Sequence, residues 1–302
     1  MKCFTGKLPH DQLDREAFTF KHGLVGHPAL TLDNLERVLP SLPQQQVFYS
    51  KGLLKESDNF DTAHVEHSNG LSLRQTIETI RTSNSYIMVR SPEGDASFDP
   101  LFRDLKADVE ELMRARGGVG TKAVDAMLYL FIASPNSLTP FHIDRYSTIL
   151  MQFNGSKQVC VFPQWDERVV TAADCEDYMS HTGRRPEWHE SAEPLASRFH
   201  FKPGDALHIP FMAGHLVRNG ADEVSISMSI IFNTAETVTQ MKALMLNQRL
   251  RAPMRRLGLA LRPVGANRGR DKLKAGLWNS AAHVAHATRF VFRRDSAHRP
   301  SR

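Results

Sequence analysis

Seven short segments between residues 126 and 232 constrain the fold more than any other feature of this chain. They are rich in β-branched, aliphatic and aromatic side chains and cover residues 126–133, 147–153, 157–162, 197–201, 206–210, 215–218 and 224–232. Turn-forming runs separate several of them, at residues 154–156 (NGS), 202–205 (KPGD) and 219–222 (NGAD). Many short strands joined by tight turns are typical of a sandwich or a barrel, so we expect a mostly β core.

The last of these segments alternates in character from one residue to the next. Ser225, Ser227 and Ser229 alternate with the apolar residues Val224, Ile226, Met228 and Ile230. Because successive residues of a strand point to opposite faces, one face of this strand is small and polar. Such a face is suited to lining a cavity.

The flanking regions have a helical pattern. Ser72 and Gln75 form a candidate capping box, and an apolar stripe from Leu105 to Met113 stops before Gly117. Short extended pieces lie between, at residues 46–49 and 86–90. We therefore expect a mixed, mostly helical N-terminal part (1–120), packed on a barrel (121–235).

After the barrel, a basic helical segment (236–302) is expected. A helical face from Met241 to Gln248 precedes Pro253, which is expected to interrupt the helix. A linker at residues 262–272 and a last helix from Leu273 to Val291 complete the pattern.

The composition is that of a soluble globular protein, with 41% hydrophobic and 24% charged residues. No apolar run is long enough to span a membrane, and residues 1–10 lack the apolar core of a secretory signal. Cys3, Cys160 and Cys175 form neither a disulfide framework nor the paired spacing of a zinc site. A cytoplasmic location is therefore expected.

The net charge of +5 is unevenly distributed along the chain. Residues 249–302 hold 14 Lys and Arg against 2 Asp and Glu, which leaves 24 basic and 31 acidic residues elsewhere. The basic segment could bind an anionic surface, nucleic acid or an acidic partner, or it could be a solvated face of helices that form a homodimer. No recognised DNA-binding motif accompanies it.

Three residues carry the chemistry: His142 and Asp144 in TPFHID (139–144), and His215 at the end of HIPFMAGH (208–215). An H-x-D pair followed downstream by a second His is the ligand order of a 2-His-1-carboxylate triad, which binds Fe(II) on one face and leaves the other open. Residues i and i+2 of a strand point the same way, so His142 and Asp144 can converge on one metal.

Two alternatives compete with this triad in a chain that has 14 histidines. His64, Glu66 and His67 also cluster, but outside the strand-rich region and without a downstream partner, so we interpret them as a surface cluster. His208 could replace His215 as the third ligand. We prefer His215 because it follows Gly214 at the start of a segment.

The run from Thr139 to Pro163 resembles the core of the JmjC-type, cupin-fold 2-oxoglutarate oxygenases, nearest to the branch of the asparaginyl hydroxylase that acts on hypoxia-inducible factor. In that family a Thr stands three residues before the first His ligand and a Lys fifteen residues after it, and Thr139 and Lys157 occupy these positions here. The resemblance covers roughly residues 120–234 and implies a double-stranded β-helix (jelly-roll) core.

By resemblance, Thr139 and Lys157 would bind the distal carboxylate of 2-oxoglutarate, and Gln152 and Ser229 would line the same pocket. Tyr129 precedes the motif on a strand and could line the pocket or be an ordinary core aromatic, and Gln152 could equally be a half-exposed strand residue. A lysine that points into a barrel is costly unless a carboxylate partners it. The alternative is that Lys157 points outward after a hairpin. Departures from the family pattern also exist.

The departures concern two positions where the hydroxylase has Asn. They hold Thr148 and, on the last strand, Ser229 or a neighbour. These differences do not affect the three expected iron ligands. They concern the identity of the substrate and the details of co-substrate binding.

The resemblance implies an Fe(II)- and 2-oxoglutarate-dependent dioxygenase that uses O2, hydroxylates an aliphatic C–H group and releases succinate and CO2. The substrate is a protein side chain or a small molecule. N-demethylation by the same chemistry, a cupin enzyme that does not use 2-oxoglutarate and a non-catalytic cupin-fold metal- or ligand-binding regulator are the alternatives. Residues 164–196 form a long insertion to which the sequence assigns no role.

Overall fold

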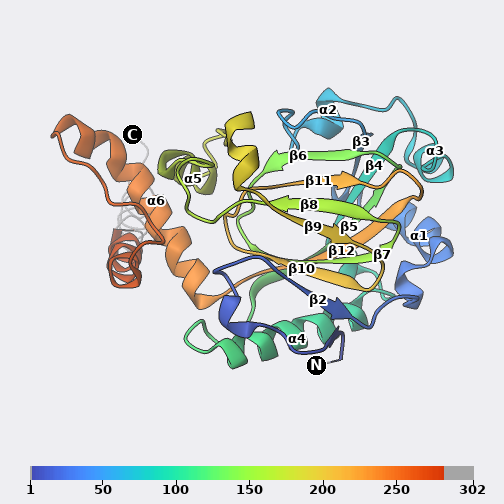
Figure 1. Ribbon diagram of the computed structural model, residues 1–302, viewed down its shortest axis with the longest axis horizontal. Coiled ribbons are helices and arrows are strands. Elements are labelled where there is room, and N and C mark those ends of the chain that lie inside the picture. Colours follow the sequence, from blue (N-terminus) through green and yellow to red (C-terminus); the bar gives the residue numbers. More distant parts are fainter. Residues whose placement is uncertain (1, 282–302) are drawn as a thin grey trace, which may run out of the picture. The chain divides into compact units, whose positions relative to one another are not determined.

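Two antiparallel sheets form the core of the protein, in the computed structural model that describes residues 2–281 (Figure 1). The smaller sheet has the order β6-β11-β8-β9, and the larger sheet has the order β1-β2-β10-β7-β12-β5-β4-β3. The barrel region contains β5 (Val124–Ala133), β6 (Leu138–His142), β7 (Ser147–Asn154), β8 (Lys157–Val161), β9 (Ser197–Phe201), β10 (Asp205–Ile209), β11 (His215–Asn219) and β12 (Ser225–Asn233). All of them except β6 correspond to one of the seven expected segments. Strands β5 to β12 supply four neighbours in each sheet, which is a jelly-roll arrangement.

The N-terminal part extends the larger sheet at both of its edges. β1 (Phe4–Thr5) and β2 (Phe18–His22) lie beyond β10, and β4 (Ser85–Arg90) and β3 (Val47–Lys51) lie beyond β5. The boundary expected near residue 120 therefore cuts through a continuous sheet, because β4 pairs directly with β5. The helices of this part are α1 (Leu32–Val38), α2 (Ala63–Glu66), α3 (Leu73–Glu78) and α4 (Asp99–Arg116). α3 begins with the predicted Ser72–Gln75 capping box, and α4 ends before Gly117 as expected.

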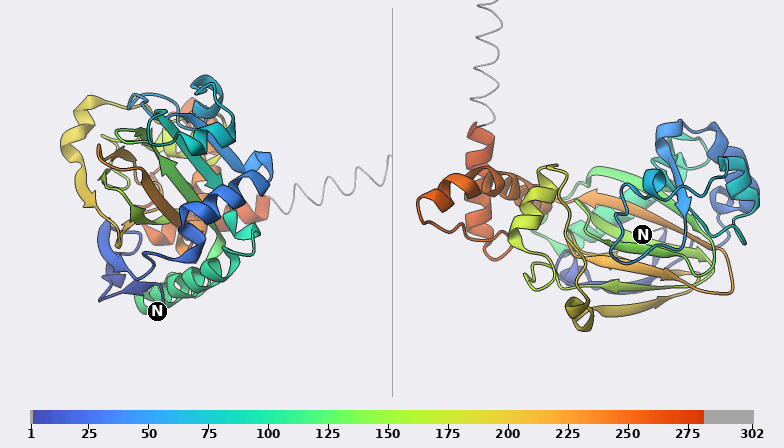
Figure 2. Two further views of the ribbon diagram at one scale, coloured as in Figure 1. Left: turned by 90° about the vertical axis from the view of Figure 1, so that its right-hand side faces the viewer. Right: turned by 90° about the horizontal axis from the view of Figure 1, so that it is seen from above.

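The two faces of the larger sheet differ in the way the Ser/apolar alternation predicts. Ile226, Met228 and Ile230 of β12 join one apolar core with Leu105 and Val109 of α4, which runs along the sheet in Figure 1 and in the left view of Figure 2. The serines of β12 are also buried, and Ser227 accepts a hydrogen bond from Lys157 of β8, so their face is turned toward the smaller sheet. A polar site would therefore lie in the interior between the two sheets.

The chain forms two compact units, and the jelly roll belongs to the first, Met1–Val170 with Pro186–Thr237. The second unit contains α5 (Ala172–Met179), most of α6 (Ala235–Arg256) and a further helical stretch at residues 268–281. Within it, the buried Glu176 carboxylate accepts hydrogen bonds from the Arg251 guanidinium at 2.5 and 2.6 Å.

Three expectations for the rest of the chain have clear outcomes. α6 continues through Pro253 to Arg256, so the expected interruption is wrong. The part of the expected last helix beyond residue 281 lies outside the described residues. Cys3, Cys160 and Cys175 are all buried, and none of them is part of a disulfide in the described residues. Within the described residues, no helix is long and apolar enough to cross a membrane.

Candidate metal centre and ligand pocket

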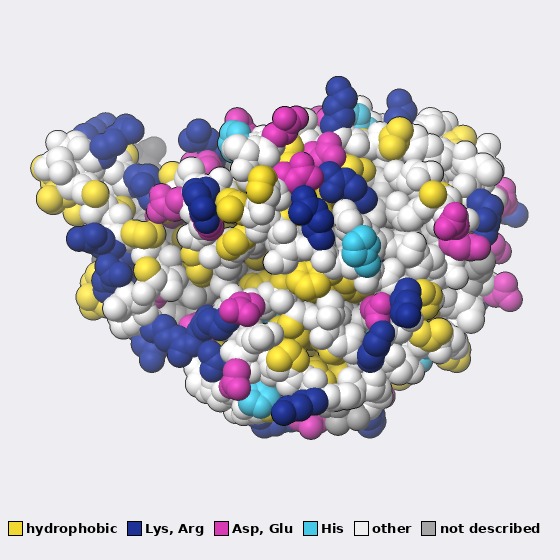
Figure 3. Space-filling view, viewed as in Figure 1, with side chains coloured by type: hydrophobic (Ala, Val, Ile, Leu, Met, Phe, Trp, Pro, Cys, Tyr) yellow, Lys and Arg dark blue, Asp and Glu magenta, His cyan; other side chains and the backbone are white. Residues whose placement is uncertain are grey.

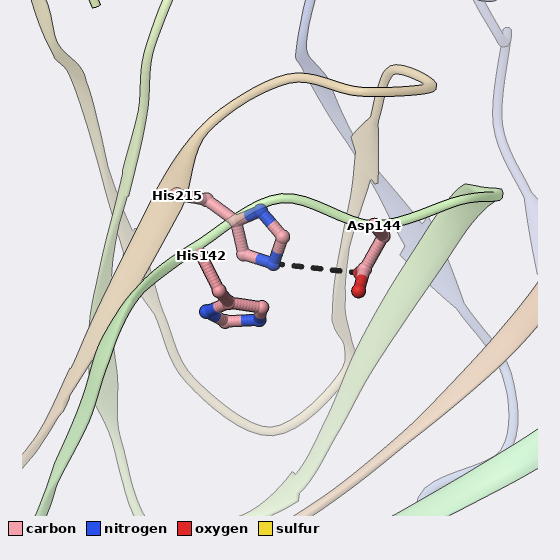
Figure 4. A group of neighbouring side chains, drawn as sticks. All are labelled: His142, Asp144 and His215. Atoms are coloured by element: carbon pink, nitrogen blue, oxygen red, sulfur yellow. Dashed lines mark ion pairs between the residues drawn. The ribbon is translucent and has the colours of Figure 1, made fainter. Parts of the chain in front are cut away.

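The three residues of the H-x-D…H pattern meet between the sheets. His142 ends β6 and His215 begins β11, and the two residues face each other directly in the β6–β11 ladder. Their ring centroids are 4.0 Å apart, and the Asp144 carboxylate lies 3.6 Å from Nε2 of His215. Figure 4 shows the three side chains turned toward one another. All three offer ligand atoms within 4.8 Å of one another.

Asp144 reaches this position from a loop, which corrects one expectation. β6 ends at His142, so the two residues do not alternate along one strand. The Asp144 carbonyl instead accepts a hydrogen bond from the backbone N–H of Met212, at 3.2 Å, in the loop that leads into β11. The segment before His215 therefore holds the backbone of the carboxylate ligand.

Both histidines present the same ring nitrogen to the site. Nδ1 of His142 lies 2.8 Å from the carbonyl of Pro140, and Nδ1 of His215 lies 3.1 Å from the carbonyl of Ala213. A carbonyl oxygen only accepts, so each Nδ1 carries the proton and donates it. Each Nε2 then keeps its lone pair for a metal, which is how histidine ligands are usually oriented.

The electrostatics of the site favour metal binding. Burial, followed by the neighbouring His215, lowers the pKa of His142 to about 4, so the imidazole is neutral at pH 7. A neutral imidazole is the form that binds metal, and two imidazoles with one carboxylate are the donor set of non-haem Fe(II). The residues present therefore fit the metal that the sequence pattern predicts.

The competing histidines do not join this group. His208 lies on β10 with its ring fully buried; its Nδ1 contacts the Thr148 carbonyl, and its Nε2 accepts the N–H of Asp14. Its neighbours Leu207 and Ile209 point into the jelly roll, so His208 points to the opposite face. His64 and Glu66 are exposed on α2, and among the described residues only the triad forms a metal-binding group.

Lys157 lies inside the jelly roll, which rules out the outward orientation. Its side chain leaves the first residue of β8, is 7% exposed, and donates a hydrogen bond from Nζ to Oγ of Ser227 at 2.6 Å. Burial lowers the pKa of this ammonium to about 7, and no carboxylate of the described residues offsets this shift. Within residues 2–281, Lys157 therefore has no anionic partner.

Thr139 lies on β6 beside a tyrosine that the sequence did not single out. The buried hydroxyl of Tyr86, on β4, hydrogen-bonds with the Thr139 side chain, and burial raises the pKa of Tyr86. The Phe60 ring contacts both Tyr86 and the ligand His142, with centroids 5.8 and 5.0 Å apart. Tyr86 and Phe60 come from a segment 50 to 80 residues before the motif and carry no local pattern.

Two polar atoms of β7, Oγ1 of Thr148 and Oε1 of Gln152, are buried and have no hydrogen-bond partner in the part of the chain that the structure describes. Thr148 pairs with Ile231 and Gln152 with Ser227, so both share the interior face. The Gln152 amide nitrogen donates to the carbonyl of Asn154 and to Oγ of Ser225, at 2.5 and 3.1 Å. Its co-substrate role remains a prediction, since much of its bonding capacity is used in the β7–β8 turn.

Tyr129 and Ser229 are cross-strand partners on β5 and β12. Ser229 is buried, while Tyr129 is half-buried and stacks on Phe131 with centroids 6.2 Å apart. Burial raises the pKa of Tyr129 to about 12. We call Tyr129, Phe131 and Phe60 the aromatic wall, and the contact of this wall with a co-substrate or a substrate remains a prediction.

The outer side of β6 and β11 packs tightly behind the ligands. Phe141 contacts Phe162 and Trp188 at centroid distances of 5.5 and 5.4 Å, and Trp188 comes from the 164–196 insertion. A Cβ placed on Gly214 would lie 2.7 Å from the Phe141 ring. One part of the insertion therefore supports the residues next to His142 and His215.

Comparison with known sequences agrees with this geometry. Residues 36–237 match the profile of the cupin-like domain family, which is two thirds of the chain. The chain belongs to this family. The expected cupin fold, with mostly antiparallel sheets and flanking helices, is thereby confirmed. No curated protein sequence matches the chain.

Among solved structures, the cupin-like chain is similar to those of YcfD, a ribosomal oxygenase from Escherichia coli. One covers 88% of this chain with a TM-score of 0.47 and 13% identity. Two others, in complex with cobalt and succinic acid or with cobalt and 2-oxoglutarate, each cover 91% at 13% identity, with TM-scores of 0.48 and 0.47. The chain spans 59% to 67% of the length of these YcfD chains.

Proposed function

We propose that this protein is an Fe(II)- and 2-oxoglutarate-dependent oxygenase that hydroxylates an aliphatic C–H group. Two observations inside one jelly roll carry the proposal: the His142–Asp144–His215 group, and a buried Lys157 that has no carboxylate partner in the described part of the chain. The first fits Fe(II). The second fits the distal carboxylate of a keto diacid, which a cupin enzyme without 2-oxoglutarate does not need.

The triad would hold the metal through Nε2 of His142, Nε2 of His215 and the Asp144 carboxylate. When bound, iron supplies the redox chemistry by which O2 converts 2-oxoglutarate to succinate and CO2 and places one oxygen atom in a C–H bond of the substrate. The low pKa of His142, about 4, means that no proton has to leave this ring before metal binds at pH 7.

Lys157 would anchor the co-substrate by a charge-assisted hydrogen bond to its distal carboxylate. The hydroxyl groups of Ser227, Thr139 and Tyr86 are polar partners that could fix the orientation of that carboxylate. A carboxylate beside Lys157 stabilises the ammonium and raises its pKa from about 7. Binding of the co-substrate near neutral pH therefore takes up a proton.

The aromatic wall of Tyr129, Phe131 and Phe60 would shield the site from water and contact the substrate. A hydroxylated N-methyl group loses formaldehyde, so the same residues serve a demethylase equally well. A protein substrate would favour the asparaginyl hydroxylase branch, and formaldehyde release would favour demethylation. Product analysis by mass spectrometry separates these substrate classes.

The deciding experiment measures binding and turnover in one preparation. The protein is loaded with Fe(II) under nitrogen, 2-oxoglutarate binding is measured by calorimetry, and succinate is then measured after addition of O2 and ascorbate. We expect binding that depends on metal, followed by slow succinate release without substrate. Iron binding without 2-oxoglutarate binding would contradict the proposal, whereas binding of both without succinate under any substrate would favour a non-catalytic regulator.

The homodimer and the anionic-surface contact expected from the C-terminal segment remain predictions. The second unit carries 12 Lys and Arg and 4 Asp and Glu among its described residues. Leu257 and Leu273 are 72% and 66% exposed there, and Figure 3 shows hydrophobic side chains beside Lys and Arg over the segment that follows α6. Sedimentation velocity tests the dimer, and flotation with vesicles of anionic and of neutral lipid tests the surface contact.

A further inference from the structure

Asp14 lies outside the family-matched region, yet it contacts the segment that follows Asp144 and the segment that precedes His215. Its side chain is 1% exposed. Its Oδ1 atom accepts hydrogen bonds from Oγ of Ser147, at 2.6 Å, and from the backbone N–H of Phe211, at 3.2 Å. Residues 14, 147 and 211 are far apart in the sequence, so this carboxylate is a tertiary connection.

Each of these two partners is close in the sequence to a metal ligand. Ser147 begins β7, three residues after Asp144, and Phe211 lies four residues before His215. Met212, the residue after Phe211, has a left-handed backbone with φ of 61° and donates its N–H to the Asp144 carbonyl. A non-glycine residue in this conformation typically costs about 1 kcal/mol or more, so surrounding contacts must hold the turn in place.

His208 in turn fixes the position of Asp14. Because Nδ1 of His208 donates to the Thr148 carbonyl, its Nε2 is an acceptor and takes the backbone N–H of Asp14 at 3.0 Å. Asp14 itself has a left-handed backbone, with φ of 55°. The fully buried His208 imidazole thus holds Asp14, whose backbone is strained, against β7 and β10.

We propose that Asp14 is a positioning residue of the metal centre. Its carboxylate connects residues 144–147 to residues 211–215 and thereby keeps the Asp144 carboxylate and the His215 imidazole, 3.6 Å apart, close enough to share a metal. The inference rests on the metal site of the proposed function. Asp14 contacts neither metal nor substrate, and it acts through the two loops.

Asp108 provides a matched control within the same protein. It is 3% exposed, and its carboxylate also binds the N-terminal chain, by accepting the backbone N–H groups of Lys2, Cys3 and Phe4 at 2.7 to 2.9 Å. It lies on α4, and none of its three partners is close in the sequence to a metal ligand. Loss of Asp108 therefore tests the effect of a missing buried carboxylate anchor alone.

The experiment measures Co(II) affinity and the Co(II) absorption spectrum of apo-protein, at a temperature where circular dichroism shows each variant folded. We expect Asp14→Ala to weaken Co(II) binding on the order of tenfold and to alter the spectrum, as loss of an outer-shell partner commonly does. Asp14→Asn keeps Oδ1 as an acceptor and should restore most of the affinity. Asp108→Ala should unfold more easily than wild type but keep its Co(II) affinity and spectrum.

Equal Co(II) affinities and spectra for Asp14→Ala and Asp108→Ala would overturn the inference while leaving the metal site intact. Failure of the wild type to bind Co(II) would instead contradict the proposed function. If Asp14→Ala does not fold, Ser147→Ala decides, because it removes one donor and leaves Asp14 in place. A loss of about threefold supports the inference, by the same outer-shell argument, and an unchanged affinity overturns it.

Discussion

Two of the His–Asp pairs among the described residues, His215–Asp144 and His208–Asp14, have nearly the same dimensions and opposite surroundings. Nε2 of His215 lies 3.6 Å from the Asp144 carboxylate, and Nε2 of His208 lies 3.7 Å from that of Asp14. The Asp144 side chain is 33% exposed, whereas Asp14 and His208 are at most 1% exposed. The first pair opens toward the jelly-roll interior, and the second is enclosed on the other face of the larger sheet.

The hydrogen bonds of the two imidazoles explain the difference in what they can do. His215 donates from Nδ1 to a carbonyl and retains a free Nε2 lone pair, whereas His208 uses Nδ1 for a carbonyl and Nε2 for the N–H of Asp14. The metal-ligand pair His215–Asp144 and the structural pair His208–Asp14 therefore have the same residue types and nearly the same distance. The role of each histidine depends on the strand face on which it lies and on whether its Nε2 already has a hydrogen-bond partner.

Exchanging each histidine for alanine is the strongest test of this contrast. His215→Ala removes a ligand, so Co(II) affinity should fall by more than the ~100-fold that loss of an outer-shell partner can cost. His208→Ala leaves a cavity and two backbone groups without partners, so the free energy of unfolding should fall by about 3 kcal/mol. Metal titration and urea unfolding of both variants measure the two effects.

The contrast fails if the two variants behave alike. In particular, a Co(II) affinity lowered as far by His208→Ala as by His215→Ala would make His208 a ligand. Because His208 holds Asp14, we expect a loss of affinity for His208→Ala no larger than the roughly tenfold effect of an outer-shell change.

The sequence predicted the ligand pair but not the structural pair, and the reason lies in sequence distance. Strands β7 to β12 begin and end within two residues of their expected bounds, because period-two alternation and turn residues are local signals. β1 and β2 were missed, since β2 pairs with β10 about 185 residues later and β1 has two residues. The same reason hides Asp14, Tyr86 and Phe60, which reach the site only through tertiary contacts.

Lys157 extends the comparison to a buried cation that has a hydroxyl partner, Ser227, but no anionic partner among the described residues. Lys157→Met removes the ammonium that would bind the distal carboxylate, so 2-oxoglutarate affinity should fall about 100-fold, or ~3 kcal/mol, while Co(II) affinity stays unchanged. The free energy of unfolding should rise by about 1 kcal/mol, because a desolvated charge is replaced by an apolar chain of similar size. Calorimetry and urea unfolding measure the two changes.

The exposed Lys7 gives the control, since Lys7→Met changes the same functional group at the surface. It should alter neither the affinity nor the stability measurably. A Lys157→Met protein that binds 2-oxoglutarate as tightly as wild type would remove Lys157 from the pocket.

The pH dependence of 2-oxoglutarate binding distinguishes this buried lysine from an ordinary one. Burial lowers the pKa of the free Lys157 to about 7, and a bound carboxylate raises it, so binding is full below pH 7 and weakens as pH rises through that value. Between pH 6 and pH 8 the protonated fraction falls about tenfold, and the affinity should follow it. Calorimetry in buffers of different ionisation enthalpy should also detect proton uptake near pH 7.

This pH effect should be absent from Lys157→Met, whose residual affinity has no group to titrate at that position. A flat wild-type affinity from pH 6 to pH 8 would mean that Lys157 stays protonated in the free protein. Its neighbourhood would then contain an anion that the described residues do not supply.

Gly214 offers the smallest change that should affect one His–Asp pair and leave the other unchanged. A Cβ at this position would lie 2.7 Å from the Phe141 ring, and Phe162 and Trp188 confine that ring on its other sides. Gly214→Ala therefore forces Phe141, and with it the adjacent His142, to shift. We expect Co(II) affinity to fall about threefold, or ~0.7 kcal/mol, and the free energy of unfolding to fall by about 1–2 kcal/mol through overpacking.

Gly94→Ala is the matched control, because a Cβ there meets no atom within 4 Å. If Gly214→Ala loses stability but keeps its full Co(II) affinity, the metal ligands tolerate a shift of the Phe141 ring behind them. The His215–Asp144 pair would then be able to adjust its position, whereas the buried His208–Asp14 pair is fixed by its hydrogen bonds.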